Sequence, residues 1–177
     1  MPNVNSRPLR RIALWGQAIA LVGALSVGGF SLATWFDQAA LARTLSAGVP
    51  AAPVPEGGVL LAAYLVSLVP AALFVIAMVQ AFRLFARLAT GPVFVPQVPR
   101  GLVSLGFWAC ASAVAGIVVR TALGLVLTLN APAGSRQLVI GVGSNEIAAL
   151  VMALLLFAFA QIMGAAIALD EDNRGMV

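Results

Sequence analysis

Arg120 and Glu146 are the residues of this chain best placed to do chemistry in an apolar environment. Arg120 lies within a long apolar stretch, and Glu146 stands at the start of the next one. A charged side chain at the centre of a membrane-spanning helix costs about 2.5–3.5 kcal/mol on insertion scales, and less where it reaches the interface or a partner. We therefore predict an intramembrane ion pair between Arg120 and Glu146.

The sequence allows three roles for these two residues. The pair can hold two neighbouring helices in register. Arg120 can instead reach the outer headgroups alone, because it lies near one end of its apolar stretch. The two side chains can also line a site for a ligand or an ion.

The residue types needed for other chemistry are missing. The chain has no histidine and one cysteine, and that cysteine, Cys110, lies in an apolar run that predicts a packed thiol. The sequence offers no carboxylate pair for hydrolysis, no glycine-rich phosphate loop and no cluster of metal ligands. We therefore expect no enzyme activity, no cofactor and no metal.

Charged residues also gather in two segments outside the apolar stretches. Segment 83–100 carries three arginines and no acid, and segment 170–177 begins with three acids. We predict a cytoplasmic interaction surface made of Arg83, Arg87, Arg100, Asp170, Glu171 and Asp172. Two simpler interpretations stand beside it: the arginines hold anionic headgroups, and the acidic segment folds back onto 83–100.

The composition indicates that lipid surrounds most of the chain. Of the 177 residues, 62% are hydrophobic and 9% are charged, whereas soluble domains carry about 25% charged residues. All ten basic residues are arginines, and they stand mainly at the ends of apolar stretches. This placement suits membrane topology better than direct binding of nucleic acid.

Four stretches are long enough to cross a bilayer, since a span needs about 20 residues at 1.5 Å each. We expect spans at 12–36, 59–82, 102–129 and 147–169, and an irregular, proline-rich loop at 37–58. Segment 83–100 then joins two helical hairpins. The predicted fold class is an all-α polytopic membrane protein, with residues 1–177 forming one membrane domain.

The arginines predict which side each loop faces. If both ends of the chain are cytoplasmic, the cytoplasmic side holds Arg7, Arg10, Arg11, Arg83, Arg87, Arg100 and Arg174, and the two outer loops hold only Arg43 and Arg136. We therefore predict a multi-pass protein of the bacterial inner membrane with both termini inside.

Small residues recur at helical spacing in three of the spans and predict close helix contacts. They are Ala20, Ala24 and Gly28, then Ser112, Gly116 and Gly124, then Ala149, Ala153, Ala160 and Gly164. Arg120 and Glu146 lie on the second and third stripes. We expect a compact four-helix bundle.

The segment between the second and third spans also resembles a known family. The residues that carry the likeness are Leu84-Phe85, Gly91-Pro92-Val93-Phe94, Gln97-Val98-Pro99-Arg100-Gly101-Leu102, Gly106 and the acidic ending 169–177. They are similar to the bacterial family of four-helix integral membrane proteins called domain of unknown function 2975. The resemblance implies no catalytic residue. Because genes of that family often neighbour small helix-turn-helix regulators, it also implies a cytoplasmic helix-turn-helix partner.

Two functional hypotheses follow. The first is a non-enzymatic protein that regulates or binds another protein at the cytoplasmic face. The alternative is a small transporter or channel subunit that acts as an oligomer, with Arg120 and Glu146 lining a polar cavity.

Overall fold

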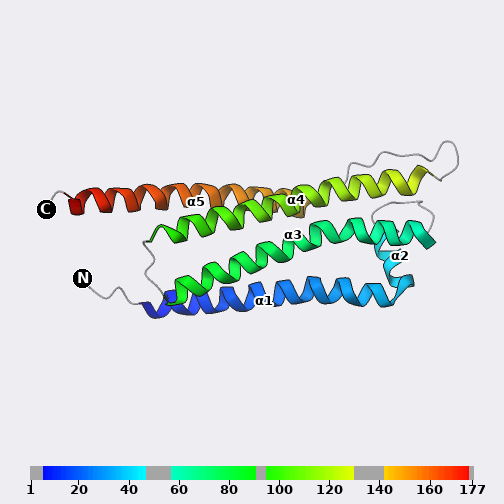
Figure 1. Cartoon of the computed structure of the whole chain (residues 1–177), viewed down its shortest axis with the longest axis horizontal. Helices are drawn as coiled ribbons and strands as arrows, with labels where there is room; N and C mark the ends of the chain where they lie inside the picture. Colours follow the sequence, from blue (N-terminus) through cyan, green and yellow to red (C-terminus); the bar gives the residue numbers. More distant parts are fainter. Residues whose placement is uncertain (1–5, 47–56, 91–94, 130–141, 176–177) are drawn as a thin grey trace.

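The computed structural model describes residues 6–46, 57–90, 95–129 and 142–175. They form the helices α1 (Ser6–Phe36), α2 (Gln38–Ser46), α3 (Gly57–Thr90), α4 (Gln97–Leu129) and α5 (Ser144–Gly175), shown in Figure 1. Four of these helices, α1, α3, α4 and α5, are long and apolar enough to cross a membrane. The all-α fold class and the four predicted spans are confirmed.

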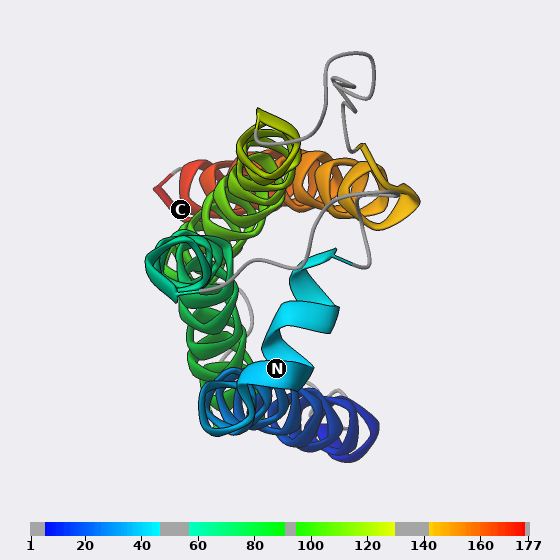
Figure 2. The same ribbon diagram turned by 90° about the vertical axis from the view of Figure 1, so that its right-hand side faces the viewer.

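The four long helices form a curved row. α1 packs on α3, α3 on α4 and α4 on α5, and among the described residues α1 and α5 make no contact. Seen along the helices, the row is an open C whose hollow side contains α2 (Figure 2). The two predicted hairpins are α1–α3 and α4–α5. The small-residue stripes predict a compact four-helix bundle. The row differs from that prediction because it is open along one side, where α1 and α5 do not meet.

The two ends of the row differ. α1 begins, α3 ends, α4 begins and α5 ends at one end of the molecule, which we call the terminal end (Figure 1). The opposite end, where α2 lies, is the distal end. This arrangement agrees with an even number of spans, and a cytoplasmic terminal end stays a prediction. Arg136 lies outside the described residues, as do the side chains of Arg7 and Arg174.

The helices are longer than the predicted spans. α3 continues to Thr90, so Arg83 and Arg87 are helical, and α4 already begins at Gln97. Apolar residues mark only the part of a helix that lies in lipid, whereas the helix itself continues through the interface until a breaker stops it. The residues expected to stop α3 after Thr90 are Gly91 and Pro92, and they lie outside the described residues.

The acidic segment belongs to α5. The interpretation in which the acidic segment folds back onto 83–100 is wrong, because α5 runs on to Gly175. The segment therefore extends in line with the helix, away from the arginines. α5 starts at Ser144, two residues before Glu146.

The irregular loop expected over 37–58 contains a helix at its start. Asp37 begins α2 as a cap, because its carboxylate accepts a hydrogen bond of 2.9 Å from the backbone N–H of Ala40. The prolines at 50–55 favoured the loop interpretation, and they lie outside the described residues.

The buried side of α2 packs near the start of α3. Leu41 and Ala42 form a small buried cluster with Leu60 and Tyr64. The Tyr64 hydroxyl also donates a hydrogen bond of 2.9 Å to the carbonyl of Ser31 in α1. This contact ties α1 to α3 at the distal end.

Two glycines let helices approach closely near the terminal end. A Cβ added at Gly16 would lie 2.7 Å from the ring of Phe85, so α1 leaves room for this ring of α3. A Cβ added at Gly101 would lie 2.9 Å from Leu84, so α4 receives another side chain of α3.

Gly106 marks a close approach between α4 and α5. A Cβ added there would lie 2.9 Å from the ring of Phe157 and 3.2 Å from the carbonyl oxygen of Ala153. The predicted stripe on α5 is partly correct, since Ala153 and Ala160 are 1% and 4% exposed. Gly164 of the same stripe is different, because an added Cβ there meets nothing within 4 Å.

Large apolar side chains are exposed along the length of the long helices. Trp15 is 71% exposed and Phe36 is 85% exposed, and similar side chains follow on each helix. Soluble monomers rarely expose apolar patches larger than a few hundred Å². These surfaces face lipid, and the chain is a multi-pass membrane protein.

The close contact at Gly106 predicts a stability effect. Gly106→Val should lower the free energy of unfolding by about 1–3 kcal/mol, because the new side chain overpacks against Phe157 and the Ala153 carbonyl. Denaturation of the purified protein in mild detergent measures this change. The matched variant Gly164→Val makes the same change in helix propensity at a site with open space around it. An equal loss of stability in both variants would contradict the close contact of Gly106 with α5.

Candidate functional site

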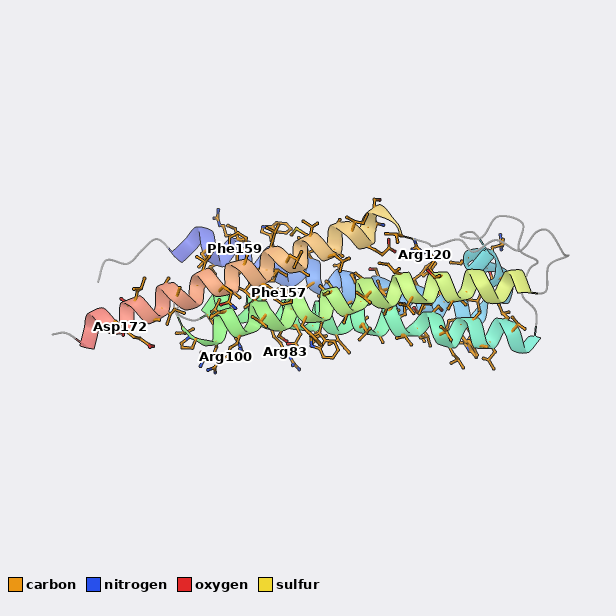
Figure 3. All side chains as sticks on the ribbon, turned by 90° about the horizontal axis from the view of Figure 1, so that it is seen from above. Arg83, Arg100, Arg120, Phe157, Phe159 and Asp172 are labelled. Carbon is orange, nitrogen blue, oxygen red and sulfur yellow. The ribbon has the colours of Figure 1, made fainter. Side chains whose placement is uncertain are left out.

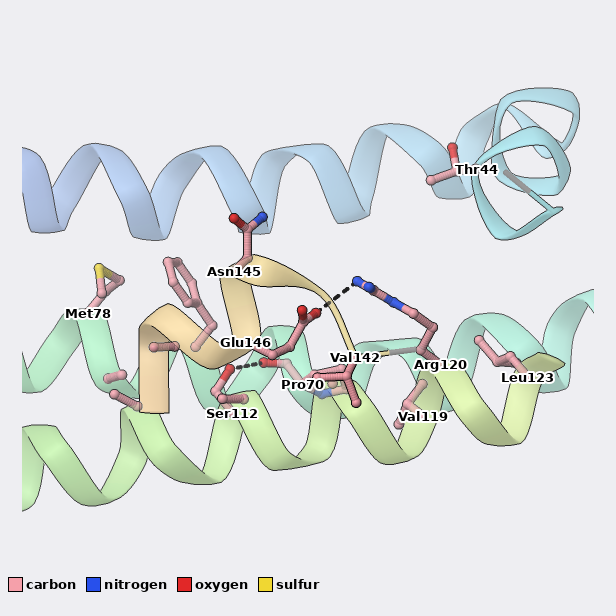
Figure 4. A pocket seen from close by; sticks show the side chains of 16 residues that line it. Thr44, Pro70, Met78, Ser112, Val119, Arg120, Leu123, Val142, Asn145 and Glu146 are labelled. Carbon is pink, nitrogen blue, oxygen red and sulfur yellow. Dashed lines mark hydrogen bonds and ion pairs between the residues drawn. The ribbon is translucent and has the colours of Figure 1, made fainter. Parts of the chain in front are cut away.

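The hollow side of the row contains a groove of about 840 Å³. Its walls come from α3, α4 and the start of α5, and Thr44 of α2 lies at its distal end (Figure 4). On α4 the lining runs from Ala109 to Leu123, and on α3 from Pro70 to Met78. The groove therefore occupies the distal part of the helices and ends within their length.

The structure brings Arg120 and Glu146 together at the distal end of this groove. Nη2 of Arg120 lies 2.9 Å from Oε1 of Glu146, so an ion pair joins α4 to α5. The Glu146 side chain is 11% exposed, whereas the Arg120 side chain is 50% exposed. The carboxylate is thus held inside the protein, and much of the guanidinium stays accessible.

The position of Glu146 follows from the local sequence. Glu146 lies in the first turn of α5, where the helix dipole favours a negative charge. Its Oε2 atom is buried, has no hydrogen-bond partner and contacts the place where a Cβ of Gly143 would be. A larger residue at 143 would displace this carboxylate from its place beside the start of the helix.

A side-chain hydrogen bond joins α4 to α3 in the middle of the groove. Ser112 donates a hydrogen bond of 3.1 Å to the carbonyl of Pro70 in α3. Proline removes one backbone donor from the helix ladder and favours a bend, and α3 changes direction part-way along its length (Figure 1). The hydrogen bond therefore joins α4 to α3 at the bend beside Pro70.

A second hollow of about 570 Å³ lies between α1, α2 and α3. Hydroxyl groups line it, but Ser26, Thr34 and Ser67 donate to backbone carbonyls of their own helices. Thr44 lines both this hollow and the groove. The hollow side of the row is thus more polar than its lipid-facing sides.

Comparison with known families decides where the chain belongs. Residues 38–175 match the family described as "Protein of unknown function (DUF2975)". The chain belongs to this family. No curated protein and no solved structure matches the chain.

The residues that suggested DUF2975 are largely packing residues. Leu84 and Phe85 fill the spaces left by Gly101 and Gly16, and Gly106 forms the close contact with α5. The match begins at Gln38, so it contains α2 to α5, and α1 precedes it.

The remaining predicted site residues separate into two groups at the terminal end. Arg83, Arg87 and Arg100 are exposed on α3 and α4, and Asp170, Glu171 and Asp172 are exposed on α5. Figure 3 places Asp172 well beyond Arg83 and Arg100 along the molecule. In the described part of this DUF2975 protein, no ion pair joins the three arginines to Glu171 or Asp172.

Sequence reasoning missed three parts of the groove. It gave no role to Gly143, the residue before α5, which makes room for Glu146. It gave no partner for Ser112, and it left out Thr44, which stands on the unpredicted helix α2. The cap residue Asp37 was a detectable signal for α2.

A double-mutant cycle tests the ion pair. Arg120→Gln should lower the free energy of unfolding by about 1–2 kcal/mol, because it leaves Glu146 buried without a counter-charge; this loss is below the 3–5 kcal/mol for fully buried pairs because Arg120 is half-exposed. Arg120→Gln with Glu146→Gln should lose less than the sum of the two single changes. Strictly additive losses, measured by denaturation in detergent, would show that the pair contributes no coupling.

Proposed function

We propose that this DUF2975 protein is a non-enzymatic interaction protein of the bacterial inner membrane and that the acidic end of α5 contacts its partner. The observation that carries the proposal is the extension of α5 at the terminal end. α5 continues past the ends of α3 and α4, and its exposed acidic residues lie there (Figure 3).

The charges at the terminal end support this proposal. Glu171 and Asp172 are exposed and contribute no ion pair to the described part of the fold. An anionic membrane surface repels such a segment, so its charges favour a position away from the bilayer. A basic protein surface is a suitable partner.

The arginines at the same end have a different role in this proposal. Arg83, Arg87 and Arg100 are exposed near the terminal ends of helices that enter the bilayer. Arginines beside a cytoplasmic membrane surface attract anionic headgroups. The positive-inside rule then supports a cytoplasmic terminal end.

The proposed partner is a small helix-turn-helix regulator. The resemblance to the family motivates this class, and the charge of the α5 end suits it, because nucleic-acid-binding surfaces are basic. Binding would occupy the regulator's DNA-facing surface. The absence of histidine from the chain supports a role without catalysis.

A binding titration tests the proposal. We would titrate the full chain in nanodiscs with a purified small helix-turn-helix regulator of the kind that genes of the family often neighbour. We expect measurable binding that weakens with salt. In the variant with Asp170→Asn, Glu171→Gln and Asp172→Asn, affinity should fall at least about tenfold, as expected for loss of complementary charge.

The control removes charge from the other group. Arg83→Gln, Arg87→Gln and Arg100→Gln together should leave affinity for the regulator within about twofold, because rim charges distant from the contact contribute little. Equal affinity of the wild type and the acid-neutralised variant would reject the acidic end as the contact surface.

The groove with Arg120 and Glu146 supports a second candidate, a transporter or channel subunit. Its volume of about 840 Å³ lies in the range of ligand pockets. The lining runs only from Ala109 to Leu123 on α4. A pathway across the bilayer would therefore need an oligomer or a second conformation, and for this reason we rank this candidate below the first.

Flux measurements separate the two candidates. If the protein is an interaction protein, proteoliposomes containing the wild type should conduct ions and small solutes no faster than liposomes without protein. A flux that Arg120→Gln abolishes, while the distant variant Arg100→Gln does not, would favour the transporter instead.

A further inference from the structure

We propose that the groove binds one phospholipid from the leaflet at the distal end, with the lipid phosphate on Arg120 and one acyl chain along α3 and α4. This binding site lies at the opposite end of the molecule from the proposed protein contact. The two proposals can therefore fail independently.

The groove is open toward the bilayer. Among the described residues α1 and α5 do not touch, so the hollow side of the C is not closed by a fourth helix contact (Figure 2). The groove lies on this side, between α3, α4 and the start of α5. A lipid can enter from the side, without crossing the protein.

The depth of Arg120 matches that of a lipid phosphate. A hydrocarbon core of about 30 Å takes about 20 residues of helix, so a core centred on the predicted span 102–129 ends near residue 125, about 8 Å of helix beyond Arg120. The long arginine side chain can reach the headgroup region from this depth. Its guanidinium lies at the distal end of the groove (Figure 4).

The groove is longer than one leaflet is deep. From Leu123 to Ala109 the lining covers about 21 Å of helix, and half of a bilayer's hydrocarbon core is about 15 Å thick. An acyl chain that starts near Arg120 and runs toward the bilayer centre would lie along this lining. The groove is therefore long enough to hold an acyl chain from Arg120 to the bilayer centre.

The ion pair prepares Arg120 for an anion. Glu146 binds Nη2 and is itself largely buried, while half of the Arg120 side chain stays exposed. A guanidinium has five N–H donors and binds phosphate through two of them at once. Glu146 thus orients the guanidinium and leaves donors available to a phosphate oxygen.

The rest of the groove suits an alkyl chain. Phe74, Ala77 and Met78 line it on α3, and Ala113 and Val119 line it on α4. Gly116 lies between them, and a Cβ added there meets nothing within 4 Å. This space is what a bound chain would fill.

Native mass spectrometry of the full chain tests the proposal. Delipidated protein in mild detergent is titrated with phosphatidylglycerol and, separately, with diacylglycerol bearing the same chains but no phosphate. We expect the first phosphatidylglycerol to bind about tenfold more tightly than diacylglycerol, since a charge-assisted phosphate contact contributes at least that much.

Two glycine variants test where the acyl chain of the lipid lies. Gly116→Leu fills the groove and should weaken binding of the first phospholipid at least about tenfold. Gly164→Leu makes the same change at a site that also has open space but does not line the groove, and it should bind like the wild type. Equal binding by both variants would overturn the proposal.

Two charge variants test the role of Arg120. Arg120→Gln should remove the preference for phosphatidylglycerol over diacylglycerol, whereas Glu146→Gln should keep it, because the guanidinium remains. An equal effect of both changes would indicate that the pair acts only on stability, and would reject the phosphate site. If Gly116→Leu instead dissolves a dimer of this chain, the groove is a protein interface and the proposal is wrong.

Discussion

The fold depends on contacts that hold helices together without help from the hydrophobic effect. Lipid is as apolar as leucine, so burying leucine between helices in a bilayer gains little. Each neighbouring pair here is instead joined by a glycine contact near the terminal end, at Gly16, Gly101 and Gly106. Each pair is also joined by a polar contact farther along: Tyr64 to Ser31, Ser112 to Pro70, and Arg120 to Glu146.

This set of contacts explains the open row and the groove together. The contacts join α1 to α3, α3 to α4 and α4 to α5. Among the described residues, none joins α1 to α5. The row therefore curves without closing, and its hollow side carries the polar contacts of α3, α4 and α5. The Arg120–Glu146 pair is both a structural contact and the ion pair of the groove, among the residues that the structure describes.

The two ends of the molecule consequently present different chemistry. At the terminal end, arginines stand at the helix ends and acidic residues extend beyond them on α5. At the distal end, charge lies within the fold, in a half-buried pair beside a groove. The DUF2975 match contains both the groove and the acidic segment, so the family segment alone holds both proposed sites.

Composition and spacing alone determined the four spans, the two hairpins and the pairing of Arg120 with Glu146, because lipid thickness and the cost of a charge in lipid act on each segment locally. Local patterns could also have revealed α2, whose cap is Asp37. Only the tertiary structure decided which glycines lie at close contacts and that Gly116 faces open space. The reason is that a small residue permits close approach on any face, and the choice of face depends on side chains such as Phe85 and Phe157 on another helix.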